Sequence, residues 1–136
     1  MTLATATPDM ELALPARAAN IAVVRHALGA FGEAFAIEEE TLSNIRLAVT
    51  EACTNVVVHA YPDGREGSLE VCATLHEEEL IVVVRDEGPG IAPRTDGPGL
   101  GLGLPLIASL AGSVLLGRAD ERTEVRMTFP LSSARA

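Results

Sequence analysis

A carboxylate and an amide side chain stand one helical turn apart near the middle of the chain. Glu51 and Asn55 are spaced i, i+4, so on a helix they project side by side. The amide oxygen of Asn55 is a suitable ligand for Mg²⁺, which keeps several waters and bridges to substrate phosphates. The neighbouring carboxylate can take a proton from a hydroxyl or a water. Taken alone, the pair is equally consistent with the solvated stripe of an amphipathic helix.

A second candidate carboxylate follows a run of apolar residues. The segment Asp86–Gly90 reads Asp-Glu-Gly-Pro-Gly and comes just after Leu80–Val84. A carboxylate at the end of a buried strand needs a polar partner. The exocyclic amine of adenine is one such partner, and a contact with it would also make the site specific for adenine. Gly88 and Gly90 are expected to supply freedom in φ and room for a base to approach. The alternative is that Asp86 only caps the turn that follows.

A second glycine-rich run precedes a predicted helix. Residues 99–104 read Gly-Leu-Gly-Leu-Gly-Leu, and backbone N–H groups at a helix start can hold phosphates. A lone glycine pattern is also consistent with a flexible loop, but the three segments in this order indicate a nucleotide site. The chain contains no lysine, which excludes both the Walker A lysine and the strand lysine of eukaryotic-type protein kinases.

Length and composition limit the remaining possibilities. We expect a single domain over residues 1–136, with residues 1–8 frayed, and a hydrophobic content of 48% excludes a disordered body. A net charge of −9 argues against nucleic acid or an anionic membrane as partner. Cys53 and Cys72 lack metal or redox spacing and are interpreted as buried thiols of a reducing compartment. Without a leader or a long apolar run, a cytoplasmic protein is expected.

Hydrophobic periodicity predicts the elements that position these residues. The predicted bounds are an edge strand at Met10–Leu14, helices from Pro15 to Gly32 and from Ile37 to Tyr61, strands at Leu69–Leu75 and Leu80–Val84, a loop at 87–100, a helix from Pro105 to Ala111, and strands at Val114–Leu116 and Thr123–Phe129. Tight turns between strands favour an α+β fold, with a mixed, mostly antiparallel sheet and helices on one face. Thr123 shares the parity of Val125 and Phe129, so it is expected to face the core.

Three motifs carry a resemblance to a known superfamily. Glu51–Tyr61 (Glu-Ala-Cys-Thr-Asn-Val-Val-Val-His-Ala-Tyr) resembles the N-box of the gyrase, heat-shock chaperone, histidine kinase and mismatch-repair ATPases. The segments Asp86–Ile91 and Gly99–Leu104 resemble the two glycine boxes of that superfamily. From Met10 to Phe129 the chain resembles, more narrowly, the small anti-sigma factor serine/threonine kinases of bacterial partner-switching systems.

The resemblance implies a two-layer Bergerat-type sandwich that binds Mg-ATP. Asn55 would coordinate the metal, Glu51 would act as base toward a seryl hydroxyl, and Asp86 would read adenine. The residues implied to bind the nucleotide are Asn55, Asp86, Gly88, Gly90, Ile91, Gly99, Leu100, Gly101, Leu102, Gly103 and Thr123. The resemblance further implies that a sigma factor is held inactive and that a serine of a STAS-domain anti-anti-sigma partner is phosphorylated, and it allows a homodimer.

The predicted lid over the nucleotide departs from this family. Several relatives carry a basic residue directly before the glycine run, where this chain has Pro98 and Gly99. Arg94 is the lid's only cation and is expected to stabilise charge during phosphoryl transfer. An Arg94→Ala variant with unchanged nucleotide affinity and partner control would favour a binding-only, nucleotide-gated regulator.

Two further expectations concern the first helix. A detached histidine kinase catalytic domain is a third interpretation, in which His26 is the one remote candidate for a phosphoacceptor. Arg17 and Arg25 are expected to face a partner, because they are solvent-facing arginines in an acidic protein.

Overall fold

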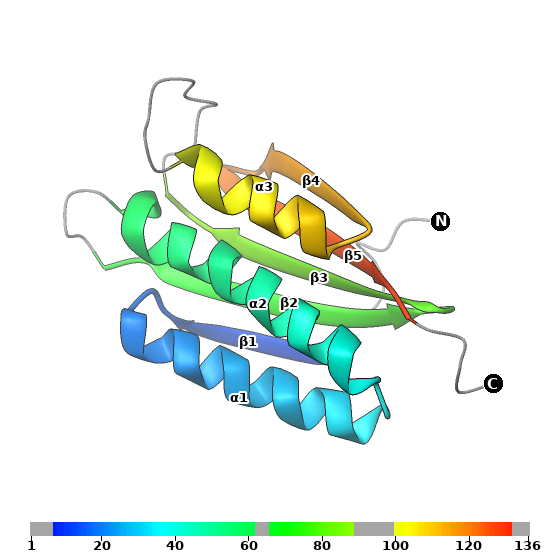
Figure 1. Ribbon diagram of the computed structural model, residues 1–136. Helices are drawn as coiled ribbons and strands as arrows, with labels where there is room; N and C mark the ends of the chain where they lie inside the picture. The colour runs from blue at the N-terminus through cyan, green and yellow to red at the C-terminus, as the bar shows by residue number, and fades with distance from the viewer. Residues whose placement is uncertain (1–6, 62–65, 89–99, 132–136) are drawn as a thin grey trace.

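A five-stranded sheet with its helices on a single face makes up the described part of the chain (Figure 1). The computed structural model describes residues 7–61, 66–88 and 100–131, with residues 100–103 described by their backbone alone. The elements in chain order are β1 (Met10–Pro15), α1 (Ala18–Ala34), α2 (Glu39–Asn55), the π-helix η2 (Val56–Ala60), β2 (Ser68–His76), β3 (Glu79–Asp86), α3 (Leu100–Leu110), β4 (Ser113–Ala119) and β5 (Arg122–Pro130). The predicted α+β fold class and element order are confirmed. The expected fraying of residues 1–8 falls largely outside the described residues.

The strands are ordered β1-β2-β3-β5-β4, and each neighbouring pair is antiparallel. The prediction of a mixed sheet is therefore wrong for the described strands, which form no parallel pair. β4 does run in the same direction as β3, but β5 lies between them. The reason is the hairpin at Asp120 and Glu121, through which the chain turns back from β4 and inserts β5 beside β3.

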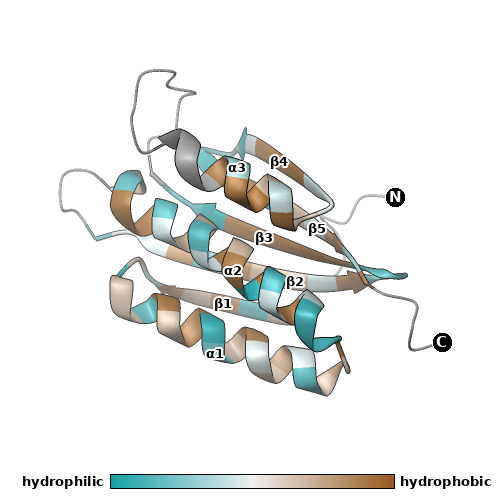
Figure 2. Cartoon of the chain, in the orientation of Figure 1, coloured by the Kyte–Doolittle hydropathy of each residue, from teal (hydrophilic) through white to brown (hydrophobic). Residues whose placement is uncertain are grey.

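The hydrophobic core lies between the sheet and the three α-helices. Leu28 of α1, Ile45 of α2 and Ile107 of α3 are fully buried against Val82 and Met127 of the sheet. Figure 2 shows hydrophobic residues along β3 and on the helices that cover the sheet. The core consists mainly of aliphatic side chains. No helix within residues 7–61, 66–88 or 100–131 is long and apolar enough to cross a membrane.

The two cysteines are buried free thiols, as predicted. Cys53 is packed in the core on α2, and burial raises the pKa of its thiol to about 12. Cys72 lies on the sheet face away from the helices, beside Val83, and burial again raises its pKa. Thiols with a raised pKa are poor nucleophiles near neutral pH, so neither is a candidate for the chemistry of this protein.

Two helix boundaries differ from the predictions. Pro15 does not open α1 but ends β1, where an edge strand tolerates a residue without an N–H group. Gly32 does not end α1 but lies inside it, and a Cβ there would stand 2.4 Å from Cδ2 of Leu42 on α2. This glycine therefore lets α1 and α2 approach closely instead of stopping a helix.

The third helix begins earlier than predicted. α3 starts at Leu100, so Pro105 lies inside the helix and not in its first turn. Proline has no N–H group to donate to the carbonyl four residues earlier, here that of Gly101. Residues 100–103 of the glycine run consequently form the first turn of α3, and the predicted loop ends sooner than expected.

Candidate nucleotide-binding site

The elements that carry the predicted site residues converge at one end of the molecule (Figure 1). η2 ends there at Ala60, β3 ends there at Asp86, and α3 begins there at Leu100. The arrangement brings together segments that are separated in the sequence. It follows the general rule that ligand sites form where element ends expose backbone groups and polar side chains.

Asp86 is the buried carboxylate of this site. It is 4% exposed, and its Oδ1 accepts a hydrogen bond of 2.8 Å from the backbone N–H of Gly88. Burial raises the pKa of Asp86 above its ordinary value, while the Gly88 N–H and the positive charge of Arg118 act in the opposite direction. Oδ2 accepts no hydrogen bond from the described residues, so this oxygen is available to a ligand that donates one.

Thr123 lies directly beside Asp86. The two residues are opposite each other in the β3–β5 register, and Thr123 is also 4% exposed. The predicted inward orientation of Thr123 is confirmed, because it follows the same alternation as the buried Val125 and Phe129. A buried carboxylate and a buried hydroxyl therefore stand as neighbours on the face of the sheet that the helices cover.

Gly88 is held against the end of η2. A Cβ added at Gly88 would stand 2.2 Å from the carbonyl oxygen of Ala60 and 2.9 Å from its carbonyl carbon. The φ of Gly88 lies outside the left-handed region, so the expected freedom in φ is not what requires glycine here. The requirement is the close approach of two backbone segments, which any side chain would prevent.

A Gly88→Ala substitution is expected to cost about 1–3 kcal/mol of stability, the range for overpacking, and to weaken nucleotide binding. The Ala60 carbonyl cannot move without disturbing η2, so the strain falls on the turn that follows Asp86. Gly117→Ala is the matched control, since a Cβ at Gly117 meets nothing within 4 Å. Thermal unfolding and ATP titration of both variants provide the measurement. Equal melting temperatures for the two would contradict this account of Gly88.

Tyr61 joins three segments around the site. Its hydroxyl donates to the carbonyl of Ser68 at 2.7 Å and accepts from the N–H groups of Ser68 at 3.1 Å and Glu87 at 2.9 Å. The end of η2, the start of β2 and the residue after Asp86 are thereby fixed relative to one another. Tyr61 is part of the N-box resemblance, but the sequence contained no signal for these contacts.

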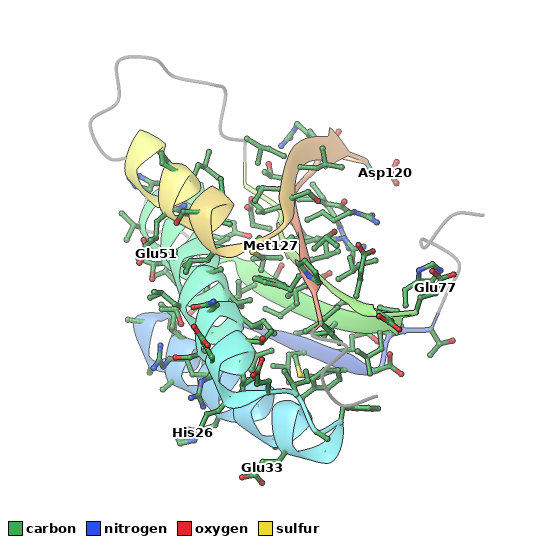
Figure 3. All side chains as sticks on the ribbon, turned by 45° about the vertical axis from the view of Figure 1, so that its right-hand side comes forward. His26, Glu33, Glu51, Glu77, Asp120 and Met127 are labelled. Carbon is green, nitrogen blue, oxygen red and sulfur yellow. The ribbon has the colours of Figure 1, made fainter. Side chains whose placement is uncertain are left out.

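Glu51 and Asn55 lie near the end of α2, and both are half-buried. Ala52 and Cys53 point into the core between them, so the i, i+4 pair remains on the flank of the helix. Figure 3 shows Glu51 on the part of α2 that lies beside α3. Within the described residues neither side chain forms a hydrogen bond with the protein. Both are therefore available to substrate or metal.

The helix that carries this pair changes its winding directly after Asn55. Residues Val56–Ala60 form one π-helical turn, an irregularity that is frequent at functional sites. The change positions the Ala60 carbonyl against Gly88. It also carries His59, which is half-buried in the last turn and contributes no described contact to the site.

The remaining predicted site residues belong to the loop and the start of α3. Gly90, Ile91, Arg94 and Gly99 lie outside the described residues. The backbone of the run Leu100, Gly101, Leu102 and Gly103 forms the first turn of α3. The first N–H groups of a helix have no partner within the helix, so their use for phosphate binding stays a prediction.

Sequence reasoning missed Arg118. Its Nη1 donates to Thr123 Oγ1 at 3.0 Å and to the carbonyl of Gly88 at 3.3 Å. The predicted strand at Val114–Leu116 ended before this residue, whereas β4 extends to Ala119 and pairs Arg118 with Thr123. A longer strand in the prediction would have placed Arg118 and Thr123 on the same face.

This fold and site define a known class of domain. Residues 14–129 match the family of the histidine kinase-like ATPase domain, and the chain belongs to that family. Within it, the chain belongs to the family of the serine-protein kinase RsbW. The serine-protein kinase RsbW of Halalkalibacterium halodurans is 31% identical to it over 134 residues, covering 88% of this chain and 81% of the relative.

Other matches are partial. The serine-protein kinase RsbW of Bacillus velezensis is 31% identical over 86 residues, covering 63% of this chain and 54% of the relative. The anti-sigma F factor of Clostridium acetobutylicum is 33% identical over 82 residues, covering 60% of this chain and 57% of the relative. The chain thus spans about half the length of several curated relatives it matches.

A solved structure shares the fold. The crystal structure of the RsbU and RsbW domains of Rv1364c from Mycobacterium tuberculosis matches with a TM-score of 0.70 and 21% identity. The match covers 92% of this chain and 33% of that chain. A likeness at this identity supports the fold and says nothing about the activity.

Proposed function

We propose that this protein is an ATP-dependent serine kinase and anti-sigma regulator that acts in the cytoplasm. It would hold a sigma factor inactive and transfer the γ-phosphate of ATP to a serine of a STAS-domain anti-anti-sigma partner. The names of its curated relatives, serine-protein kinase and anti-sigma F factor, support this direction. The observation that carries the proposal is the buried pair of Asp86 and Thr123 at the end of the molecule that also holds Glu51 and Asn55.

The donor and acceptor groups of the buried pair fit an adenine base. The free Oδ2 of Asp86 can accept from the exocyclic amine, and the hydroxyl of Thr123 stands next to it. A buried carboxylate is costly unless a donor reaches it, so the ligand supplies a contact that the protein leaves open. Gly88 holds this carboxylate in place through its N–H group.

Glu51 and Asn55 on α2 fit the phosphate end of the same ligand. Mg²⁺ is commonly held by one or two protein oxygens with the rest supplied by phosphates and water, so Asn55 suffices as a protein ligand. No cluster of three or more acidic, histidine or cysteine side chains that could hold a metal occurs in the described residues. When bound, the ion would neutralise phosphate charge during transfer.

Glu51 would perform the proton chemistry of the reaction. Its carboxylate, one turn before Asn55, would accept the proton of the seryl hydroxyl as that oxygen attacks the γ-phosphorus. The bond from the γ-phosphorus to the bridging oxygen breaks, and ADP leaves. Arg94 of the lid is proposed to stabilise the developing charge, together with the N–H groups at the start of α3.

Phosphoryl transfer and ATP binding should be measured in parallel. Purified protein is mixed with Mg²⁺, γ-labelled ATP and a STAS-domain protein, and ATP affinity is determined by titration calorimetry. Label on a partner serine supports the kinase. ATP binding without transfer would favour the binding-only regulator, and the absence of both would refute the nucleotide site.

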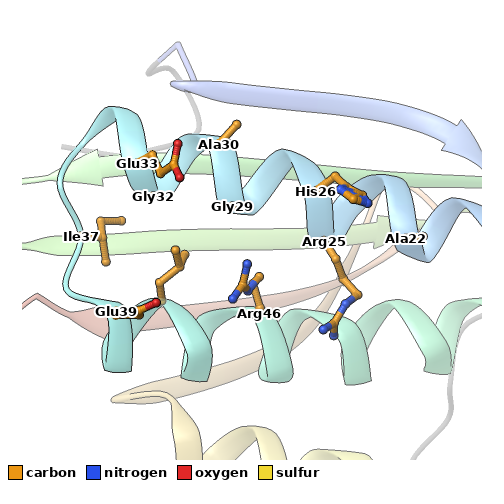
Figure 4. Close-up of a pocket in the computed structure, with 11 residues that line it drawn as sticks. Ala22, Arg25, His26, Gly29, Ala30, Gly32, Glu33, Ile37, Glu39 and Arg46 are labelled. Atoms are coloured by element: carbon orange, nitrogen blue, oxygen red, sulfur yellow. The ribbon is translucent and has the colours of Figure 1, made fainter.

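A groove between the helices is the proposed surface for a partner. It has a volume of about 620 Å³ and lies between α1 and the N-terminal half of α2 (Figure 4). Its lining residues are Ala22, Arg25, His26, Gly29, Ala30, Gly32, Glu33, Ile37, Glu39, Leu42 and Arg46. Figure 4 shows Arg25 and Arg46 extending into the space between the helices.

The groove carries charges of both signs, with Glu33 and Glu39 at one end, and the part around Arg25 and Arg46 favours an acidic segment of the partner (Figure 4). Arg25 donates to Thr50 Oγ1 at 3.0 Å, and neither Arg25 nor Arg46 has a carboxylate within 4.0 Å among the described residues. Arg17 is exposed, as expected, and forms an ion pair with Glu66, while its contact with a partner stays a prediction. In a protein of net charge −9, two uncompensated arginines in one groove are suited to a partner's carboxylates.

An Arg25→Gln/Arg46→Gln variant is expected to weaken the complex with the partner about tenfold, mainly through slower association. The control is Arg122→Gln/Arg126→Gln, which removes the same charge from the sheet face that the helices leave open. Surface plasmon resonance at two salt concentrations measures both rates. Equal weakening by the control would assign the effect to net charge and not to the groove.

A further inference from the structure

Arg118 stands at the end of a row of residues that crosses the whole sheet. Leu69 is opposite Asp86, Asp86 is opposite Thr123, and Thr123 is opposite Arg118 on the edge strand β4. Directly opposite residues place their side chains on the same face. Arg118 is therefore the next side chain after the two buried polar groups of the nucleotide site, on the face that the helices cover.

The side chain of Arg118 reaches back over this row. Its Nη1 contacts both Thr123 Oγ1 at 3.0 Å and the Gly88 carbonyl at 3.3 Å, so one guanidinium joins both walls of the site. Within the described residues Arg118 has no carboxylate within 4.0 Å, whereas Arg85, Arg122 and Arg126 on the other face are all paired with glutamates. Among the described residues Arg118 therefore bonds to Thr123 and Gly88 of the site and takes no part in the ion pairs of the sheet.

The contact determines how Thr123 can use its hydroxyl. A hydroxyl has one hydrogen to donate, and arginine can only donate. Arg118 occupies one of the two lone pairs of Oγ1, and donation to this oxygen polarises the O–H bond, so toward a ligand the hydroxyl of Thr123 is a better donor than acceptor. No described protein group accepts its hydrogen. A ligand at this position therefore meets a donor at Thr123 beside an acceptor at Asp86.

This order of groups distinguishes the two purines. Adenine presents an amine that donates and, next to it, a ring nitrogen that accepts. Guanine presents a carbonyl that accepts and a ring N–H that donates, which is the reverse. The positive charge of Arg118 also favours the ionised, accepting form of the Asp86 carboxyl.

We propose that Arg118 is a positioning residue for base selection: by donating to Thr123 and Gly88, it strengthens the hydroxyl of Thr123 as a donor and thereby favours adenine over guanine. The proposal rests on the proposed nucleotide binding of this site. In this proposal a residue of the edge strand β4, outside the N-box and both glycine boxes, contributes to the preference for one purine base.

The test compares Kd values for ATP and GTP in Arg118→Ala, Arg118→Lys and the wild type. Arg118→Ala is expected to weaken ATP binding roughly tenfold and to lower the ATP-over-GTP preference by a similar factor. Arg118→Lys, which keeps the charge and a donor, should restore part of the preference. Arg126→Ala is the control, an arginine on the opposite face of the same sheet.

A double-mutant cycle separates this role from a structural one. If Arg118 acts through Thr123, then Arg118→Ala causes little further loss of preference in a Thr123→Val background. Unchanged ATP-over-GTP preference in Arg118→Ala, or additive losses in the cycle, would overturn the proposal. A wild-type protein that binds neither nucleotide would instead refute the nucleotide site itself, so the two failures are distinguishable.

Discussion

Replacing Glu51 by glutamine is expected to lower the rate of phosphoryl transfer by roughly 100-fold to 10,000-fold, the range for loss of a positioned general base. ATP affinity should stay unchanged, because the proposed contacts to the base and the phosphates come from Asp86, Asn55 and the start of α3. Glutamine keeps the length and polarity of the side chain. The substitution therefore removes the proton acceptor with little other disturbance.

The measurement is single-turnover transfer of labelled phosphate to the partner serine, with ATP affinity determined separately. Glu40→Gln is the matched control, since Glu40 is an exposed carboxylate in the first turn of the same helix. Its transfer rate should equal that of the wild type. Transfer at the wild-type rate by the Glu51 variant would exclude Glu51 as the base.

Replacing Asp86 by asparagine is expected to weaken ATP binding roughly tenfold to 100-fold. A hydrogen bond to a charged group contributes about 1.5–3 kcal/mol, and an amide in place of the carboxylate removes this acceptor charge. An asparagine oxygen can still accept from the N–H of Gly88, so the turn after β3 is retained. Titration calorimetry against ATP gives the affinity.

The same variant should be more stable than the wild type without ligand. Burial raises the pKa of Asp86, so the folded protein binds this proton more tightly than the unfolded chain does. Wild-type stability therefore falls as pH rises from the ordinary aspartate pKa, about 3.9, through the raised folded value. Asparagine does not titrate and escapes this loss.

The gain in melting temperature should consequently be largest near neutral pH and shrink as pH falls toward 4. Thermal unfolding of both proteins across that range measures it. A variant that is less stable than the wild type at neutral pH would mean that the Arg118 charge and the Gly88 hydrogen bond outweigh the cost of burial. Such a result would contradict the account of Asp86 as a carboxylate kept for a ligand.

The carboxylate of Asp86 is expected to lower the stability of the free protein and to strengthen the binding of ATP. The fold buries a carboxylate beside Thr123, and the cost of that burial is offset when a ligand donates to it. Gly88 and Tyr61 then hold the turn through backbone contacts. These contacts place rigid groups around a small number of polar atoms, as binding sites on element ends require.

The sequence alone was sufficient for features that depend on local periodicity. The i, i+4 spacing placed Glu51 and Asn55 on one flank of a helix, and the apolar run before Asp86 marked a buried strand end. The alternation along β5 correctly turned Thr123 inward. Each of these inferences needs only neighbours in the chain, which is why it could be made from the sequence.

Tertiary structure decided what lies next to what. The insertion of β5 between β3 and β4 places Thr123 beside Asp86 and brings Arg118 into the same row. The close approach of Ala60 explains Gly88, where the sequence suggested freedom in φ. Contacts between segments distant in the chain depend on strand order and packing, and no local pattern encodes these. The sequence therefore determined which residues could do the chemistry, and the order of the strands determined which of them meet.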